Sequence, residues 1–296
     1  MITVVINPAA GTNPRKNSMD RVAELFERAG APARLVPLTS GVDAVPIARE
    51  AIESGAGAVV AAGGDGTVNR VVSALAGSNT PLGVIPLGTL NHFAKDLHLP
   101  LDLDAAVSVI AARHVKKVDV GVVNDRVFVN NSSIGVYPSI VVEREELRRR
   151  RGYGKWRALA VATAHVLRHY RGITIRIDAG DSPRVVRTPF FAVGNNEYLV
   201  DGMRLGARVR LDAGRLLIYY APRVHTRDLP ELVVLALLGH ATDSRVLESF
   251  AAETIQVDSP SRRTLRVAFD GEVARMATPL RYRTWPGALN VIVPVR

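Results

Sequence analysis

The sequence predicts two domains: an amino-terminal α/β domain with a parallel sheet, followed by a carboxy-terminal antiparallel β-sandwich. The length of 296 residues exceeds that of most single domains. Short apolar runs alternate with helical patterns up to about residue 110, which is typical of a parallel sheet covered by helices. Beyond about residue 118, short β-rich runs end in Gly, Pro, Asn or Asp, as in sandwiches. We expect domains at 1–118 and 119–285, with 286–296 returning to the first.

Each element of the first domain follows from local patterning. Apolar runs of four to six residues before turn residues predict strands, and apolar residues at helical spacing predict helices. The expected strands are Thr3–Ile6, Ala33–Pro37, Ala58–Ala62 and Leu82–Ile85. The expected helices are Met19–Ala29, Ala44–Ser54, Val68–Ala76 and Leu103–Ala112. In such a sheet, ligands bind beyond the carboxyl ends of the strands.

The second domain is predicted to be built of short strands with two helical interruptions. The helices are expected at Ser139–Tyr170 and Leu229–Leu238. A last strand, Ala288–Pro294, is expected to rejoin the first domain. The expected strands are Val118–Val123, Arg126–Asn130, Ile173–Asp178, Phe190–Gly194, Arg208–Leu211, Leu216–Ala221, Glu253–Asp258 and Leu265–Asp270.

The chain is strongly basic, with a net charge of +10. Much of the excess lies in segment 148–171, where Arg148–Arg151 are followed by Tyr153 and Trp156. Such a segment attracts anionic membrane surfaces, although a solvated helix face is an equal alternative. No nucleic-acid-binding motif accompanies the charge, so no nucleic-acid partner is expected.

The cysteine-free composition excludes disulfides and thiolate metal sites, and it suits a reducing compartment. The first residues resemble no signal peptide, and no apolar run approaches the roughly 20 residues needed to span a bilayer. We therefore expect a cytoplasmic protein that is peripheral to the membrane.

A glycine-rich turn, Gly63-Gly64-Asp65-Gly66-Thr67-Val68-Asn69, directly follows the apolar run at 58–62. Its three glycines are expected to adopt positive φ and to let the backbone approach a ligand closely. A helix that begins near Val68 would offer unpaired N–H groups to an anion. The segment therefore favours phosphate binding over an ordinary strand–helix turn.

Three further motifs accompany this turn. Asn7-Pro8-Ala9-Ala10-Gly11 follows the first strand, and Pro86-Leu87-Gly88-Thr89-Leu90-Asn91 follows the fourth. Far downstream, Asp270-Gly271-Glu272 ends a predicted strand with two carboxylates. Together these motifs resemble the diacylglycerol kinase catalytic-domain family, which includes bacterial lipid kinases and the sphingosine and ceramide kinases.

The resemblance covers nearly the whole chain and implies a Rossmann-like, NAD kinase/diacylglycerol kinase-like fold. It implies an ATP-dependent lipid kinase that uses Mg²⁺ and transfers the γ-phosphoryl group to a hydroxyl of a diacylglycerol-like lipid at an anionic membrane surface. A homodimer is left open. The positions that match the family's ATP site are Asn7, Pro8, Ala9, Ala10, Gly11, Thr39, Gly63, Gly64, Asp65, Gly66, Thr67, Val68, Asn69 and Thr89.

The resemblance also implies roles for the acidic residues. Glu272 matches the general base that takes the proton from the lipid hydroxyl, and Asp65 acts on the metal–phosphate unit. Asp119 matches an acidic position that faces the cleft; a strand-end aspartate in a turn is the alternative. Asp270 is expected to support Glu272.

The sequence departs from the family pattern at three positions. His92 and Thr12 stand where relatives commonly carry Asp and Lys. Ala213 stands where bacterial members place the carboxylate of a structural Mg²⁺ site, and Asp212 is one place off. On a strand, Asp212 would point to the other face, so we expect that metal to be absent.

Two other functions compete with a lipid kinase. The first is a kinase with a soluble acceptor, because NAD kinases and phosphofructokinases share the Gly-Gly-Asp-Gly signature. The second is a non-catalytic nucleotide or lipid sensor, which the departures at His92 and Ala213 keep open. Retention of Asp65 and Glu272 counts against a sensor, since a sensor has no use for a base.

Overall fold

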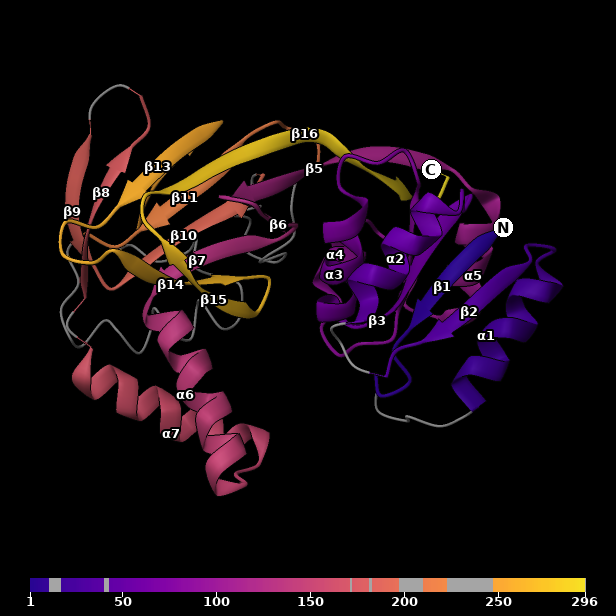
Figure 1. The fold of residues 1–296 in the computed structure, drawn as a ribbon, viewed down its shortest axis with the longest axis horizontal. Helices are drawn as coiled ribbons and strands as arrows, with labels where there is room; N and C mark the ends of the chain where they lie inside the picture. Colours follow the sequence, from indigo (N-terminus) through magenta and orange to yellow (C-terminus); the bar gives the residue numbers. More distant parts are fainter. Residues whose placement is uncertain are drawn as a thin grey trace. The chain divides into compact units, whose positions relative to one another are not determined.

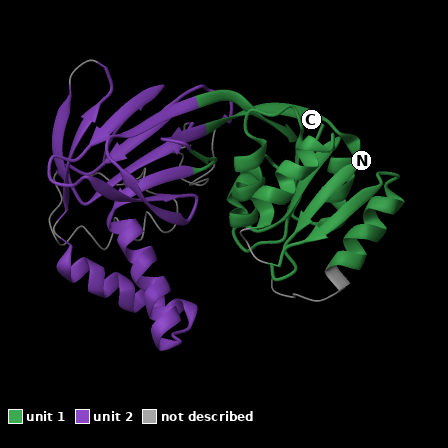
Figure 2. Cartoon of the chain, in the orientation of Figure 1, with its two compact units in different colours: residues 1–120, 126–130, 285–296 green, residues 121–125, 131–284 purple. Residues whose placement is uncertain are grey.

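The computed structural model describes residues 1–10, 17–39, 43–170, 172–180, 183–196, 210–222 and 247–295. The chain forms two compact units (Figure 2). Unit 1 comprises Met1–Val120, Arg126–Asn130 and Trp285–Arg296, and unit 2 comprises Gly121–Asp125 and Asn131–Thr284.

Unit 1 is built around a parallel sheet with strand order β2-β1-β3-β4-β16. Its core strands are buried along their whole length, as expected for a sheet covered on both faces. The strands and helices of this sheet are β1 (Ile2–Ile6), α1 (Asn17–Arg28), β2 (Ala33–Pro37), α2 (Ala44–Glu53), β3 (Ala58–Gly63), α3 (Asp65–Leu75), β4 (Leu82–Pro86), α4 (His92–Asp96), α5 (Leu103–Ala112) and β16 (Leu280–Ile292).

The helices divide between the two faces of the sheet (Figure 1). Val22 and Phe26 of α1 pack with Val107 of α5 on one face of β1 and β3. Helices α2 and α3 contact each other and the opposite face. Helix α5 begins where predicted, because the Asp102 carboxylate accepts a hydrogen bond from the Ala105 N–H at 3.0 Å.

Unit 2 is an antiparallel sandwich. One sheet has the order β12-β11-β10-β7-β14-β15, and β13, β8 and β9 continue from β16 in the other. The Phe191 and Tyr282 rings, one from each sheet, lie 6.4 Å apart between centroids. The remaining elements are β5 (Val115–Val123), β6 (Arg126–Phe128), β7 (Asn131–Gly135), α6 (Val136–Arg151), α7 (Lys155–His169), β8 (Ile173–Asp178), β9 (Arg184–Thr188), β10 (Phe190–Asn195), β11 (Leu216–Tyr220), β12 (Glu248–Ala252), β13 (Thr254–Asp258), β14 (Thr264–Phe269) and β15 (Glu272–Ala277).

This architecture confirms the predicted fold class, but several predicted elements were wrong in detail. The single helix expected at Ser139–Tyr170 is two helices, because Gly152 ends α6 in the left-handed conformation with φ +63°. Arg210 and Leu211 belong to no strand. The rest of Arg208–Leu211 and the predicted helix Leu229–Leu238 lie outside the described residues. The sequence analysis predicted none of α4, β7, β9, β12 and β15.

Candidate active site

The loops that carry the candidate site in unit 1 leave one edge of the parallel sheet. Ile6 at the end of β1 pairs with Pro37 of β2 and with Ala62 of β3. Gly63 at the end of β3 pairs with Pro86 at the end of β4. The loops after β1, β2, β3 and β4 therefore begin side by side, at the edge where such sheets bind ligands.

The glycine loop is shorter than the sequence predicted. Helix α3 begins at Asp65 rather than near Val68, with Gly64 as its N-cap in an extended conformation. Gly63, Gly64 and Gly66 do not have the positive φ that we expected. The Thr67 and Val68 N–H groups both donate to the Gly64 carbonyl, at 2.9 and 3.1 Å, so helix geometry leaves the Asp65 and Gly66 N–H groups without intrahelical acceptors. Those groups are available to an anion.

Close backbone approach, and not unusual φ, explains the glycines. A Cβ at Gly63 would lie 2.5 Å from the Thr67 Oγ1. A Cβ at Gly88 would lie 2.6 Å from the Gly64 Cα, so the loops after β3 and β4 touch through their backbones. The Leu87 N–H also donates to the Gly63 carbonyl at 3.0 Å. A side chain at Gly88 would separate the two loops, and one at Gly63 would collide with Thr67 in the same segment.

Two asparagines support this pair of loops. Asn91, in the left-handed conformation with φ +50°, donates from Nδ2 to the Gly88 carbonyl at 2.8 Å. Asn69 is buried in α3, and its Oδ1 has no hydrogen-bond partner among the described residues. A buried, unpartnered amide oxygen is unusual and indicates a missing ligand or water. Thr89 is exposed at the loop surface.

The loops after β1 and β2 are held by side-chain hydrogen bonds. The Asn7 Oδ1 accepts from the Ala9 N–H at 3.0 Å, and the Asn7 N–H donates to the Ala62 carbonyl at 2.9 Å. These bonds fix Asn7 to Ala10 as a turn against β3, whereas Gly11 and Thr12 lie outside the described residues. The Thr39 hydroxyl donates to the Asp43 carboxylate at 2.5 Å.

Asp65 is the first residue of α3 and is partly buried. Within the described ranges, no group of three or more His, Cys, Asp or Glu side chains could hold a metal ion. Mg²⁺ usually binds through one or two carboxylates together with substrate phosphates. A single carboxylate beside an anion-binding helix terminus fits Mg²⁺ that arrives with a nucleotide.

In unit 2, Asp270 and Gly271 form the two-residue turn between β14 and β15. Their φ values, +45° and +86°, are those of the tight turn typical of Asp-Gly hairpins. The Asp270 Oδ1 accepts from the Asn131 N–H at 3.1 Å. Asp270 therefore ties the hairpin to β7, and Glu272, partly buried, begins β15.

Tyr137 of α6 belongs to the same neighbourhood, and our sequence reasoning missed it. Burial raises the pKa of Tyr137 against the opposing charge of Arg144, and the Asp270 carboxylate adds to the rise. The phenol thus stays protonated near the Asp-Gly-Glu hairpin. The contacts of α6 with β14 and β15 reveal this proximity, so no local sequence pattern could have found it.

Asp119 lies inside β5 and is 3% exposed, so the strand-end alternative was wrong. Its Oδ1 accepts a hydrogen bond from the Gly287 N–H at 2.8 Å. Gly287 has φ +59° and sits in β16. This hydrogen bond links β5 to β16, so Asp119 has a structural role within unit 1.

Asp212 does not lie on a strand, contrary to our expectation, but in the bend before β11. Its Oδ1 is 3.0 Å from the Arg210 Nε. The Ala213 N–H donates to the Asn196 Oδ1 at 3.1 Å. Absence of a structural Mg²⁺ at this turn stays a prediction.

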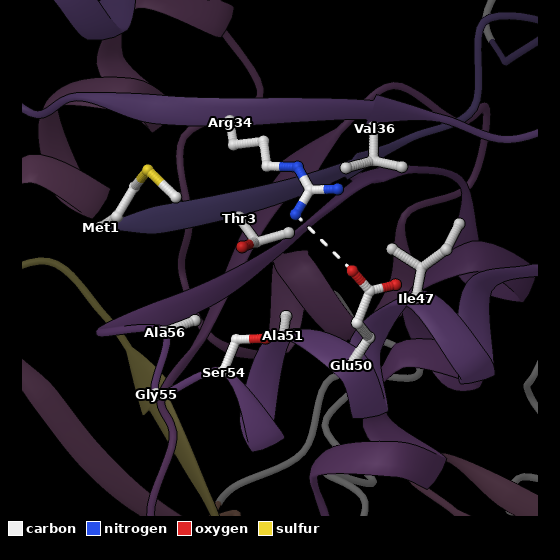
Figure 3. A pocket seen from close by; sticks show the side chains of 10 residues that line it. All are labelled: Met1, Thr3, Arg34, Val36, Ile47, Glu50, Ala51, Ser54, Gly55 and Ala56. Atoms are coloured by element: carbon white, nitrogen blue, oxygen red, sulfur yellow. Dashed lines mark ion pairs between the residues drawn. The ribbon is translucent and has the colours of Figure 1, made fainter.

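A cavity of about 170 Å³ in unit 1 is separate from the candidate site (Figure 3). It is lined by Met1, Thr3 and Ala56, which lie toward the amino ends of β1 and β3. Arg34 and Glu50 face each other across it at 3.6 Å. The glycine loops leave the opposite ends of these strands.

The chain thus combines a glycine-loop α/β domain with an antiparallel sandwich domain. Residues 1–123 match the family model described as the diacylglycerol kinase catalytic domain. Residues 132–293 match the YegS C-terminal NAD kinase beta sandwich-like domain. The chain belongs to the diacylglycerol kinase catalytic-domain family.

Individual relatives agree with this assignment. A diacylglycerol kinase of Staphylococcus saprophyticus is 28% identical over 271 residues, which cover 91% of this chain and 88% of the relative. One of Staphylococcus haemolyticus is 29% identical over 272 residues, covering 91% and 81%. A diacylglycerol kinase structure from Bacillus anthracis has the same fold, with a TM-score of 0.72, 20% identity and coverage of 99% and 96%. The family assignment makes the chain an ATP-dependent lipid kinase.

Proposed function

We propose that this kinase transfers the γ-phosphoryl group of ATP to a hydroxyl of a diacylglycerol-like membrane lipid. The observation that carries the proposal is the backbone contact between Gly64 and Gly88 beside the start of α3. This contact creates a side-chain-free surface next to unpaired helix N–H groups, which suits a polyphosphate. The names of the Staphylococcus relatives supply the acceptor class.

The nucleotide contacts are proposed at the loops of this edge. The Asp65 and Gly66 N–H groups at the start of α3 and the loop backbones would receive the phosphates. The Asn69 Oδ1 is an acceptor, so its partner would be a hydroxyl, a water or Mg²⁺ that arrives with the nucleotide. The proposed nucleotide-site residues are Asn7, Pro8, Ala9, Ala10, Gly11, Thr39, Gly63, Gly64, Asp65, Gly66, Thr67, Val68, Asn69 and Thr89.

Asp65 would hold Mg²⁺ together with the phosphates, directly or through water. Mg²⁺ supplies charge neutralisation of the transferring phosphoryl group when it is bound. The chain's own contribution is to position the phosphates, because phosphoryl transfer depends mostly on positioning and electrostatics.

On the acceptor side, Glu272 would act as general base. As the lipid hydroxyl oxygen forms its bond to the γ-phosphorus, its proton passes to a Glu272 carboxylate oxygen and the bond to ADP breaks. Asp270 would act as a positioning residue, since its turn sets where Glu272 begins β15. Asp119 remains a candidate acid, although its recorded bond goes to the backbone of β16.

Transfer of radiolabel from ATP into a total lipid extract tests the function directly. We expect one labelled lipid whose mobility matches a phosphorylated diacylglycerol. Label confined to water-soluble products would indicate a soluble acceptor, and no label above a heat-inactivated control would indicate a sensor.

The α6–α7 pair carries features of a membrane-binding element. Trp156 at the start of α7 is 76% exposed, with the Lys155 Nζ 5.7 Å from its ring centroid. The Arg157 guanidinium lies 4.2 Å from the Tyr153 ring centroid. Exposed aromatic rings among cations suit the interface of an anionic membrane.

No helix in the described part of the chain is long and apolar enough to span a bilayer. We propose a peripheral, cytoplasmic location; a homodimer stays a prediction.

Replacing Arg148–Arg151 with glutamine should weaken binding to anionic vesicles steeply at low salt. Each cation near an anionic surface contributes about 1 kcal/mol, but Glu145 and Glu146 already pair with Arg148 and Arg149 at 3.3 and 3.1 Å. We therefore expect a loss of about tenfold to a hundredfold in partitioning rather than the full sum, measured by vesicle sedimentation. A fourfold Arg→Lys variant keeps the charge and serves as control. If the glutamine variant and the wild type sediment equally, Arg148–Arg151 form a solvated helix face that does not bind membranes.

A further inference from the structure

A cavity of about 250 Å³ in unit 2 is lined by three arginines and lies apart from the Asp-Gly-Glu hairpin turn. Arg266 of β14 and Arg275 of β15 are direct cross-strand partners, and Arg262 precedes β14. Ser139 in the first turn of α6 and Tyr170 at the end of α7 close it from the helical side.

Among the described residues, no carboxylate accompanies the arginines of this cavity. None of the residues that line the cavity is acidic, and none of the three arginines has an ion pair within the described ranges. Like charges directly opposite each other on neighbouring strands destabilise a hairpin. An anion in the cavity would remove that repulsion, and planar guanidinium groups bind phosphate oxygens in pairs.

Tyr170 adds a hydroxyl group to the cavity. Its oxygen is buried and makes no hydrogen bond in the described structure. It lies 3.3 Å from where a Cβ of Gly135 would stand, which places it at the amino-terminal end of α6. Burial raises the pKa of Tyr170 although Arg262 opposes the rise, so the phenol remains a hydrogen-bond donor at neutral pH. A buried donor without an acceptor is costly unless a ligand supplies one.

We propose that Arg262, Arg266, Arg275 and the Tyr170 hydroxyl form a second oxyanion site, in unit 2, that binds a phosphate group. The chemistry fits inorganic phosphate or the phosphomonoester of an anionic lipid such as phosphatidic acid. The site is built from residues of unit 2 alone and uses none of the proposed nucleotide-binding or catalytic residues. It therefore does not depend on the proposed function.

Calorimetric titration of the full chain with inorganic phosphate tests the site. The paired variant Arg266→Gln and Arg275→Gln should lose at least about tenfold in affinity for one phosphate, because each charged hydrogen bond is worth about a factor of ten or more. The control pair, Arg176→Gln and Arg281→Gln, removes the same charge from exposed strand positions of unit 2 and should bind like the wild type.

Tyr170→Phe isolates the hydroxyl with little risk to folding, because the removed oxygen has no hydrogen-bond partner among the described residues. We expect about tenfold weaker phosphate binding and no loss of melting temperature without phosphate. In parallel, phosphate should raise the melting temperature of the wild type more than that of the Arg266/Arg275 variant.

Vesicles distinguish the two sources of phosphate. If phosphatidic acid in phosphatidylcholine vesicles retains the wild type and the control pair more than the Arg266/Arg275 variant, the ligand is a lipid headgroup. If inorganic phosphate alone shows the difference, the ligand is free phosphate. Equal phosphate affinity in the wild type, the Arg266/Arg275 variant and Tyr170→Phe would overturn the proposal, as would an absence of phosphate binding by the wild type.

Discussion

Asp65→Asn is expected to lower turnover by about 10²–10³-fold while the fold stays intact. The carboxylate stands at the first position of α3, beside the backbone contact of the two glycine loops. If it neutralises or orients the Mg²⁺–phosphate unit, the amide keeps its shape and loses its charge. The measurement is initial-rate transfer from ATP to diacylglycerol in mixed micelles, so that membrane binding does not limit the rate.

A helix effect must be separated from a catalytic one, because an acidic residue in the first turn also stabilises a helix by about 0.3–1 kcal/mol. Asp20 occupies the first turn of α1 and is exposed. Asp20→Asn therefore removes a comparable helix interaction without touching the site, and it should turn over like the wild type. If Asp65→Asn also keeps near-normal turnover, with the same small change in melting temperature, Asp65 serves only its helix.

The central strands of the unit 1 sheet could be predicted because β1, β3 and β4 are short, mostly apolar runs that are buried along their whole length. A strand buried on both faces needs no partner-dependent alternation, so Ile2–Ile6 and Ala58–Gly63 stand out locally. Helix α5 was predicted to the residue because its N-cap, Asp102, is also a local signal. In these elements, the local sequence preference and the burial in the folded domain favour the same secondary structure.

The sandwich of unit 2 was harder to predict because its strands depend on their partners. Strand β15 reads Glu-Val-Ala-Arg-Met-Ala, and most of its residues are only partly buried or exposed. Its existence follows from the Asp270–Gly271 turn, which folds it back on β14. The Asp-Gly pair is itself a strong hairpin signal. The sequence analysis interpreted it only as part of a catalytic motif. Gly152, which ends helix α6 in the left-handed conformation, is a similar local signal, and the sequence analysis did not use it.

At the candidate site, the sequence indicated which loops meet but not how. The glycines were expected to relieve unusual φ, whereas Gly63 and Gly88 are required by what lies opposite them: the Thr67 side chain and the Gly64 backbone. The Gly88–Gly64 contact joins two different loops and leaves no trace in a local pattern. The same applies to Tyr137 near Asp270 and to the Asp119 bond with Gly287.

Glu272→Gln is expected to lower kcat by about 10²–10⁴-fold with little change in ATP affinity. Glutamine keeps the length and planarity of the side chain at the start of β15, so the hairpin pairing with Phe269 should survive. What is lost is the group that accepts the proton of the lipid hydroxyl. Glu253, exposed between β12 and β13, provides the matched control, and Glu253→Gln should leave kcat unchanged.

Calorimetric titration of ATP–Mg²⁺ into the Glu272→Gln variant decides between the acceptor side and the nucleotide side. A base acts on the lipid hydroxyl, so its removal leaves the nucleotide contacts of unit 1 in place and the titration should match the wild type. A large loss of ATP–Mg²⁺ affinity would instead assign Glu272 to the metal or the nucleotide. The base would then have to be sought at Asp270 or Asp119, whose recorded bonds to the Asn131 and Gly287 N–H groups give each a structural task as well. For either of those, the Asp→Asn change should lower the melting temperature along with kcat, because a neutral amide oxygen is the weaker acceptor of a backbone N–H. A loss of kcat in Glu272→Gln without loss of stability or nucleotide affinity is thus the result expected of a base at Glu272 and of neither aspartate.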